Sequence, residues 1–269
     1  MEDSAQVERQ YLSGPYGQVH LYRAGQPGSQ RPLVCFHQSP LSGRTFDALM
    51  REMGRDRVVL APDTPGYGQS DAPPEPLTIE GYAESHGAVI DPMDLGPIDV
   101  LGVHTGARIA VEFARKRREQ VRHVVLVGAA VYTEEERAAQ RQWTGQSLAP
   151  TEGSDGMHLL TMWHNWAKFR GPGVTDDMIE RYLSDSLRQR GNAGFAMKAV
   201  FSHDMAAALR DLDQPVLVFN VRDDIYEATR RSAACLKNGR VVDLSPSGLW
   251  PLETRTQEIA GMIRQHCAA

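Results

Sequence analysis

The sequence predicts an α/β domain in which a mostly parallel sheet carries flanking helices and a helical cap is inserted late in the chain. Three observations lead to this fold class. Short runs rich in Val and Leu recur along the chain, and helical patterns separate them. The runs are apolar without alternation, as strands buried on both faces of a parallel sheet require. One long segment, from about residue 133 to 208, contains no convincing strand.

Seven segments are expected to form strands. The first follows a Gly-Pro-Tyr-Gly turn at 14–17, and the others are short apolar runs bounded by polar residues. Between them lie helical patterns, and strand–helix alternation of this kind predicts a parallel sheet with helices on both faces. The strands are expected at 19–23, 33–37, 57–61, 98–103, 123–127, 216–220 and 240–244, and the helices at 45–53, 78–91, 107–118, 226–236 and 254–266.

The strand-free segment is expected to be a lid or cap, because about 75 residues is too long for an idle loop. We place the core at 1–130 and 210–269 and the helical cap at 131–209. The cap carries Trp143, Trp163 and Trp166 and five of the ten methionines. Ser154-Asp155 is a plausible N-cap for a helix that runs through Lys168. Leu159, Met162, Trp163 and Trp166 then share one face, as packing or as a substrate wall.

Composition excludes several classes of protein. The 269 residues, 41% of them hydrophobic, suffice for a large core. A net charge of −5 argues against nucleic-acid binding. A mean hydropathy of −0.40 and the lack of a long apolar run argue against a membrane span, and the polar N-terminus does not resemble a signal peptide. Cys35, Cys235 and Cys267 show no metal or redox spacing, so we expect reduced thiols and a cytoplasmic location.

Polar motifs follow four of the expected strands. In open α/β sheets, ligands bind beyond the carboxyl ends of the strands, so these motifs mark the candidate site. One of them, Gly102-Val103-His104-Thr105-Gly106, opens directly into a helix. The other three are His37-Gln38-Ser39-Pro40, Asp63-Thr64-Pro65-Gly66-Tyr67-Gly68-Gln69-Ser70 and Arg222-Asp223-Asp224.

Over nearly the whole chain and in the right order, this set resembles the α/β-hydrolase family, and its small cap-bearing members in particular. The family's HGxP loop corresponds to 37–40, its D-x-P-G-x-G-x-S loop to 63–70, and its G-x-S-x-G nucleophile elbow to 102–106. The resemblance implies an eight-stranded type of sheet. It assigns the triad acid to Asp223, with Asp224 as a fallback. It assigns the oxyanion hole to the backbone N–H groups of Ser39 and Thr105.

Two of the three triad positions depart from the family pattern. The serine is replaced by His104, and near the expected late histidine Gly248 is followed by Leu249 and Trp250. Acyl transfer through a serine ester is therefore excluded, because loss of the serine alone costs a factor of about 10⁶ in a serine protease. The elbow nevertheless holds residue 104 in a strained conformation, which persists where it serves a site.

His104 has a plausible catalytic role. An imidazole has an ordinary pKa of about 6.5 and acts as a base near neutrality. We hypothesise a His104–Asp223 dyad in which the carboxylate fixes the tautomer and stabilises the imidazolium. A base that faces an oxyanion hole suits proton abstraction beside a carbonyl, and therefore elimination, isomerisation, cyclisation or C–C cleavage. It suits activation of a water for hydrolysis equally well.

The predicted substrate pocket also includes residues from the loops and the cap. His158, His164 and His203 are candidates to replace the missing late histidine from above, and Asp63 is expected to tie its own loop through backbone N–H groups. Trp250 would make the pocket drier. The expected lining residues are His37, Gln38, Trp163, His203, Leu249 and Trp250.

Three classes of function remain open. The first is an enzyme acting on a small, largely apolar carbonyl compound such as an ester, lactone or polyketide-like intermediate. The second is an inactive pseudo-hydrolase that serves as a small-molecule receptor or carrier, and the third is a scaffold. A His104–Asp223 contact and an open pocket would favour the enzyme; a pocket filled by Trp250 would favour the scaffold. We expect no cofactor, no metal ion, no nucleic-acid or membrane partner, and a possible homodimer.

Overall fold

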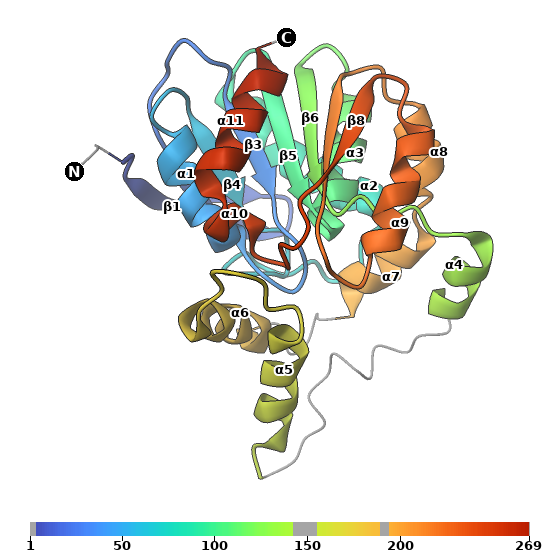
Figure 1. Cartoon of the computed structure of the whole chain (residues 1–269). Helices are drawn as coiled ribbons and strands as arrows, with labels where there is room; N and C mark the ends of the chain where they lie inside the picture. Colours follow the sequence, from blue (N-terminus) through green and yellow to red (C-terminus); the bar gives the residue numbers. More distant parts are fainter. Residues whose placement is uncertain (1–3, 142–154, 189–193, 269) are drawn as a thin grey trace.

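The computed structural model describes residues 4–141, 155–188 and 194–268. Its centre is an eight-stranded sheet in the order β1-β2-β4-β3-β5-β6-β7-β8 (Figure 1). β1 pairs antiparallel with β2, β2 pairs antiparallel with β4, and all other neighbours are parallel. The strands are β1 (Val7–Gly14), β2 (Gly17–Ala24), β3 (Leu33–Phe36), β4 (Val59–Pro62), β5 (Ile98–Val103), β6 (Val121–Val127), β7 (Val216–Asn220) and β8 (Gly239–Asp243).

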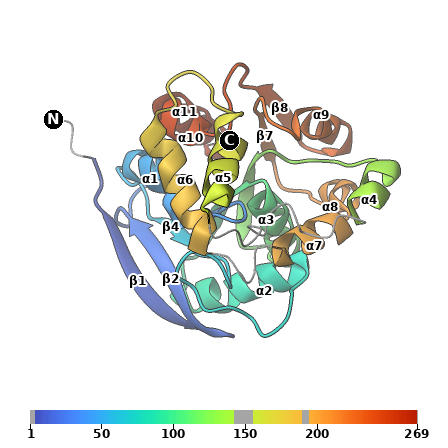
Figure 2. The ribbon, with the colours of Figure 1, turned by 90° about the horizontal axis from the view of Figure 1, so that it is seen from below.

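Helices cover both faces of the sheet, which confirms the predicted fold class (Figures 1 and 2). α1 (Asp47–Met53) packs with α11 (Thr256–Cys267) on one face, and α2 (Ile79–Ile90) packs with α3 (Thr105–Lys116) on the other. β3 shows why its sequence is apolar without alternation. Leu33 and Cys35 belong to one apolar cluster, and Val34 and Phe36 belong to the other. Because successive side chains point to opposite faces, a strand covered on both sides must be apolar throughout.

The sequence missed β1 altogether. Its residues are exposed or half-buried, and the strand lies at the edge of the sheet. An edge strand with little burial has no apolar run to reveal it. One expected helix is divided, and one forms as expected with a short helix before it. The 226–236 segment forms α9 (Tyr226–Arg230) and a 3₁₀ turn, and the last helix is preceded by the short α10 (Pro251–Thr254).

The cap lies between β6 and β7, beyond the carboxyl ends of the parallel strands (Figure 1). α5 and α6 pack against each other, whereas α8 packs on α3 in the core. The described residues of this segment contain no strand, and no helix of the described chain is long and apolar enough to cross a membrane. Its helices are α4 (Glu134–Arg141), α5 (Met157–Ala167), α6 (Asp176–Arg188), α7 (Phe195–Ser202) and α8 (Met205–Arg210).

Three details of the predicted cap and core can be compared with the structure. Trp143 and Ser154 lie outside the described residues. α5 begins after Gly156, and Asp155 contributes one hydrogen bond to the start of the helix, because its Oδ1 accepts from the Met157 N–H at 3.1 Å. The three cysteines are free and buried.

Candidate active site

His104 lies at a tight turn between β5 and α3, with φ 49° and ψ −107°. The turn requires glycine on either side of it. A Cβ on Gly102 would lie 2.1 Å from the Gly106 carbonyl oxygen, and a Cβ on Gly106 would lie 1.9 Å from the Phe36 carbonyl oxygen. A positive φ costs a non-glycine residue about 1–3 kcal/mol. The fold therefore maintains a strained conformation that projects the His104 side chain into a pocket.

The structure brings His104 and Asp223 together, as the sequence led us to expect. Nε2 of His104 lies 2.9 Å from Oδ2 of Asp223, whose side chain is buried. The other carboxylate oxygen, Oδ1, accepts a hydrogen bond from the Ile225 N–H at 3.0 Å, which fixes the carboxylate in place. Burial alone would lower the pKa of His104. Contact with Asp223, and the nearby charge of Asp224, outweigh burial and raise that pKa above its ordinary value.

Gly128 makes room for this contact. The β7 loop that carries Asp223 is two strands away from β5, so the imidazole must pass the end of β6 to reach it. Gly128 follows β6 with φ 74°, and a Cβ there would lie 2.6 Å from Cδ2 of His104 and 2.9 Å from its Nε2. Histidine at the elbow is larger than serine, and glycine at position 128 leaves the space that the larger side chain needs.

Gly128→Ala is expected to lower both stability and turnover, because the new methyl group displaces the imidazole from Asp223. The loss of stability should exceed the loss in a control variant that places alanine at a positive φ in open space. Gly96→Ala is the matched control, since Gly96 has φ 67° and a Cβ there would meet no described atom within 4 Å. Thermal unfolding and turnover of both variants check this. Equal effects would show that position 128 carries backbone strain only.

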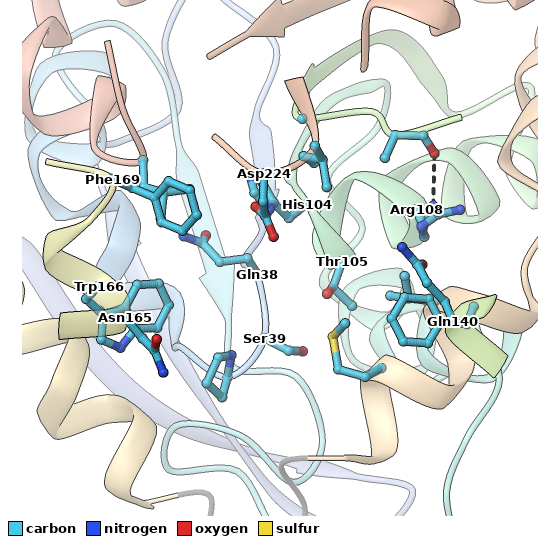
Figure 3. Close-up of a pocket in the computed structure, with 18 of the residues that line it drawn as sticks. Gln38, Ser39, His104, Thr105, Arg108, Gln140, Asn165, Trp166, Phe169 and Asp224 are labelled. Carbon is cyan, nitrogen blue, oxygen red and sulfur yellow. Dashed lines mark hydrogen bonds between the residues drawn. The ribbon is translucent and has the colours of Figure 1, made fainter. Parts of the chain in front are cut away.

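Ser39 and Thr105 line the same pocket as His104 (Figure 3). Thr105 is the first residue of α3, where backbone N–H groups have no partner within the helix and the helix dipole favours negative charge. Ser39 follows β3, the strand adjacent to β5. These positions are those expected for the donors of an oxyanion hole.

His37 and Asp63 hold the loops beside the pocket in place through hydrogen bonds to backbone groups. The Thr64 N–H donates to Nε2 of His37 at 2.9 Å, and Nδ1 of His37 lies 3.0 Å from the Gln38 carbonyl oxygen. One ring nitrogen accepts and the other donates, so the ring is neutral, and burial lowers its pKa. Asp63 is structural, as expected: its carboxylate accepts from the N–H groups of Gly43 at 2.6 Å and Gln69 at 2.9 Å.

The pocket has a volume of about 620 Å³ and lies between the strand ends and the cap. Gln38 and Leu249 line it as expected. From α5, Met162, Asn165 and Trp166 face it, at the spacing of one helical face. Sequence reasoning missed several other lining residues, including Arg108, Tyr132, Gln140, Phe169 and Phe201.

Four residues expected in the pocket are not among its described lining residues: His37, Trp163, His203 and Trp250. Trp163 packs instead in an apolar cluster with Tyr182 and Leu249, because it lies off the face of α5 that turns to the pocket. Trp250 is fully buried and stacks on Tyr182 with ring centroids 5.0 Å apart. It therefore leaves the main pocket open, and with His104 it lines only a small separate cavity of about 10 Å³.

His203 is held away from the pocket by two partners. Its Nε2 lies 2.7 Å from Oε1 of Glu112, and its Nδ1 lies 3.2 Å from a guanidinium nitrogen of Arg108. His158 and His164 lie on α5, and neither contacts the pocket. In the described part of the chain, His104 is thus the one histidine that lines it, so none of the three replaces the late histidine.

Among the residues that the structure describes, two groups of side chains have metal-ligand composition, and both lie outside the pocket. One joins Asp99, His123 and Cys267, and the other joins Glu80, Glu112 and His203. Asp99 and Glu112 already pair with arginines, at 3.1 and 2.8 Å respectively. These groups are ion-pair clusters, and they do not bear on the chemistry at His104.

Comparison with known proteins agrees with the fold. A family model described as alpha/beta hydrolase fold matches residues 31–256. The 2-hydroxymuconate semialdehyde hydrolase of a Pseudomonas species is 30% identical over 222 residues, which cover 73% of this chain and 71% of that protein. The 2-hydroxy-6-oxo-2,4-heptadienoate hydrolase of Pseudomonas putida is 27% identical over 243 residues, covering 82% and 80%.

Other similar proteins are matched over a smaller share of their own length, or share the fold alone. Three uncharacterised Mycobacterium proteins are 26% identical over 147 residues, which span only 41% of their length. The solved structure of the enol-lactonase from Burkholderia xenovorans has a TM-score of 0.75 at 18% identity, covering 97% of this chain and 100% of that one.

Proposed function

Because the chain belongs to the alpha/beta hydrolase fold family, we propose that it is an enzyme that acts on a small carbonyl compound with His104 as general base and without a covalent serine intermediate. The observation that carries this proposal is the 2.9 Å contact between His104 and Asp223 at the floor of an open pocket. A receptor or a scaffold needs neither a strained histidine nor a buried carboxylate behind it.

The contact determines which nitrogen does the chemistry. When Nε2–H faces the Asp223 carboxylate, Nδ1 holds the lone pair of the neutral ring. Nδ1 then takes a proton from a water molecule, and the water oxygen attacks the carbonyl carbon. The oxyanion that forms is held by the N–H groups of Ser39 and Thr105, each donor worth about 3–4 kcal/mol. Collapse expels the leaving oxygen, which receives the proton back from the imidazolium that Asp223 stabilises.

The names of the relatives support hydrolysis, since both similar Pseudomonas proteins are hydrolases of compounds that carry a carbonyl group. The same geometry also favours a second candidate. If Nδ1 takes a proton from carbon beside the carbonyl, the oxyanion hole holds an enolate, and the result is elimination, isomerisation, cyclisation or C–C cleavage. The elbow lacks a nucleophile, so neither route passes through an acyl-enzyme.

Turnover in ¹⁸O-labelled water tests the proposal. p-Nitrophenyl esters, simple lactones and polyketide-like carbonyl compounds form the substrate panel. Hydrolysis by a water that His104 activates is expected to place one ¹⁸O in the product, with no burst phase and no adduct from a fluorophosphonate probe. Conversion without label would establish the proton-transfer route. A burst phase or a trapped acyl-enzyme would contradict both routes, and binding without conversion of any panel member would favour a receptor.

A further inference from the structure

Arg108 is a buried cation in the wall of the pocket. It lies on α3, is 3% exposed, and lines the pocket near Gln140 (Figure 3). Its guanidinium donates to the Ala130 carbonyl oxygen at 2.9 Å and to Nδ1 of His203 at 3.2 Å. Both acceptors are neutral, so they satisfy donors without balancing the charge.

No carboxylate among the described residues lies within ion-pair distance of Arg108. Glu112 reaches it only through His203, whose Nε2 is 2.7 Å from Oε1 of Glu112. The Tyr132 ring lies under the guanidinium, 5.3 Å away. Burial lowers the pKa of Arg108 to about 10. Tyr132 and the more distant charge of Asp204 partly offset this effect of burial. Buried charges are normally paired, and in the described chain Arg108 has no carboxylate in direct contact.

The position of Arg108 relative to His104 suits a substrate with two polar groups. His104 immediately precedes α3, and its carbonyl oxygen accepts a hydrogen bond from the Arg108 N–H at 3.4 Å, so the two backbones are one turn apart. Both side chains line the pocket. In Figure 3, Arg108 and Gln140 lie on one side of His104, and Trp166 and Phe169 lie on the other. Oε1 of Gln140 is buried with no partner among the described residues, so this acceptor is open to a donor group of a ligand and not to its carboxylate.

We propose that the substrate carries a carboxylate that Arg108 binds while its reactive carbonyl group lies at His104. A guanidinium offers a planar fork of N–H donors that matches the two oxygens of a carboxylate. The apolar part of the substrate would lie against Trp166 and Phe169. This inference rests on the proposed function for its meaning in catalysis, but the binding that it claims can be measured without turnover.

Two other charged groups line the pocket, and both are exposed. Lys168 lies over the Phe169 ring, 4.7 Å from its centroid, and water screens its charge. Asp224 lies beside His104 (Figure 3), where it repels an anion from that part of the pocket. Neither competes with Arg108 for a carboxylate, so Lys168 provides a contrast variant of equal charge and different burial.

The test compares the binding of 4-phenylbutanoate with that of its neutral amide, 4-phenylbutanamide, by calorimetry at pH 7.5. The wild-type protein is expected to bind the acid about tenfold more tightly than the amide. Arg108→Gln should reduce that preference to less than about twofold and leave the affinity for the amide nearly unchanged. Arg108→Lys should retain part of the preference, because it keeps the charge and loses the fork. Lys168→Gln should retain nearly all of it.

His104→Ala separates this inference from the proposed function. It removes the base and should keep the preference for the acid, so a loss of turnover with retained preference supports both ideas. Unchanged turnover in His104→Ala would refute the base while leaving the anion site intact. The anion site is refuted if the wild-type protein shows no preference, if Arg108→Gln keeps it, or if Lys168→Gln abolishes it. Where Arg108→Gln does not fold, a wild-type protein without preference still refutes the site, and a preference that Lys168→Gln keeps and Arg108→Lys reduces assigns it to Arg108.

Discussion

Replacement of His104 by alanine is expected to lower kcat/KM by a factor of about 10² to 10⁴, the range that a general base contributes. The fold should persist, because the His104 side chain is partly exposed in the pocket and lies outside the apolar clusters of the core. Turnover of the best substrate in the panel, with circular dichroism and thermal unfolding as checks, measures this. Turnover equal to that of the wild type would exclude His104 as the base.

Two companion variants sharpen the result. His104→Gly removes the base and also the strain of φ 49°, so it should be more stable than His104→Ala by about 1–3 kcal/mol. Free imidazole added to either variant is expected to restore part of the activity, because it can occupy the space that the side chain has left. A variant that loses activity without any rescue, and also loses stability, would point to a structural role for His104.

Asp223→Asn is expected to have the second largest effect, a loss of roughly 10² to 10⁴ in kcat/KM, the upper bound being the cost of the equivalent change in a serine protease. The carboxylate holds the ring orientation and stabilises the imidazolium that forms during turnover. An amide of the same shape carries no charge to stabilise the imidazolium, and its NH₂ group favours the wrong tautomer of the ring. Asp224→Asn is the matched control, because Asp224 is exposed and contributes only a smaller, charge-based increase to the pKa of His104.

The pH dependence distinguishes this role from mere packing. A general base works in its neutral form, so activity should rise with pH through the raised pKa of His104 and then level off. In Asp223→Asn, burial is left as the main influence, so the pKa falls and the acid limb of the profile moves to lower pH. An acid limb that stays in place in this variant would show that another group controls it.

The same pair gives a stability test with a defined sign. The raised pKa means that folding favours protonated His104, so this contribution is fully present below the ordinary histidine pKa and is lost as pH rises through the raised value. The difference in Tm between the wild type and Asp223→Asn should therefore be larger near pH 5.5 than near pH 9. A difference that does not change with pH would mean that the contact contributes nothing through charge.

Much of the fold and the centre of the site followed from local features of the sequence. Apolar runs such as Leu33–Phe36 identified strands covered on both faces, because that burial leaves no polar position. The resemblance of 102–106 to the nucleophile elbow located His104, and glycine is required at 102 and 106 because a Cβ at either position would collide with backbone. The same resemblance assigned the acid to Asp223, which lies at the same edge of the sheet as His104 because the carboxyl ends of parallel strands meet there. β1 was not predicted from the sequence because it is a polar edge strand.

What the tertiary structure alone decided is which side chains surround the reaction. The rotation of α5 about its axis places Trp166 both in the pocket lining and against the neighbouring apolar cluster, whereas Trp163 contacts the cluster alone, and periodicity cannot tell these positions apart. His203 pairs with Glu112, which is 91 residues away. Arg108 is left short of an anion only because distant segments bury it. Strands and tight turns depend on neighbours in the chain, so the sequence determines them. The lining of a pocket depends on how remote elements pack, so only the folded chain reveals it.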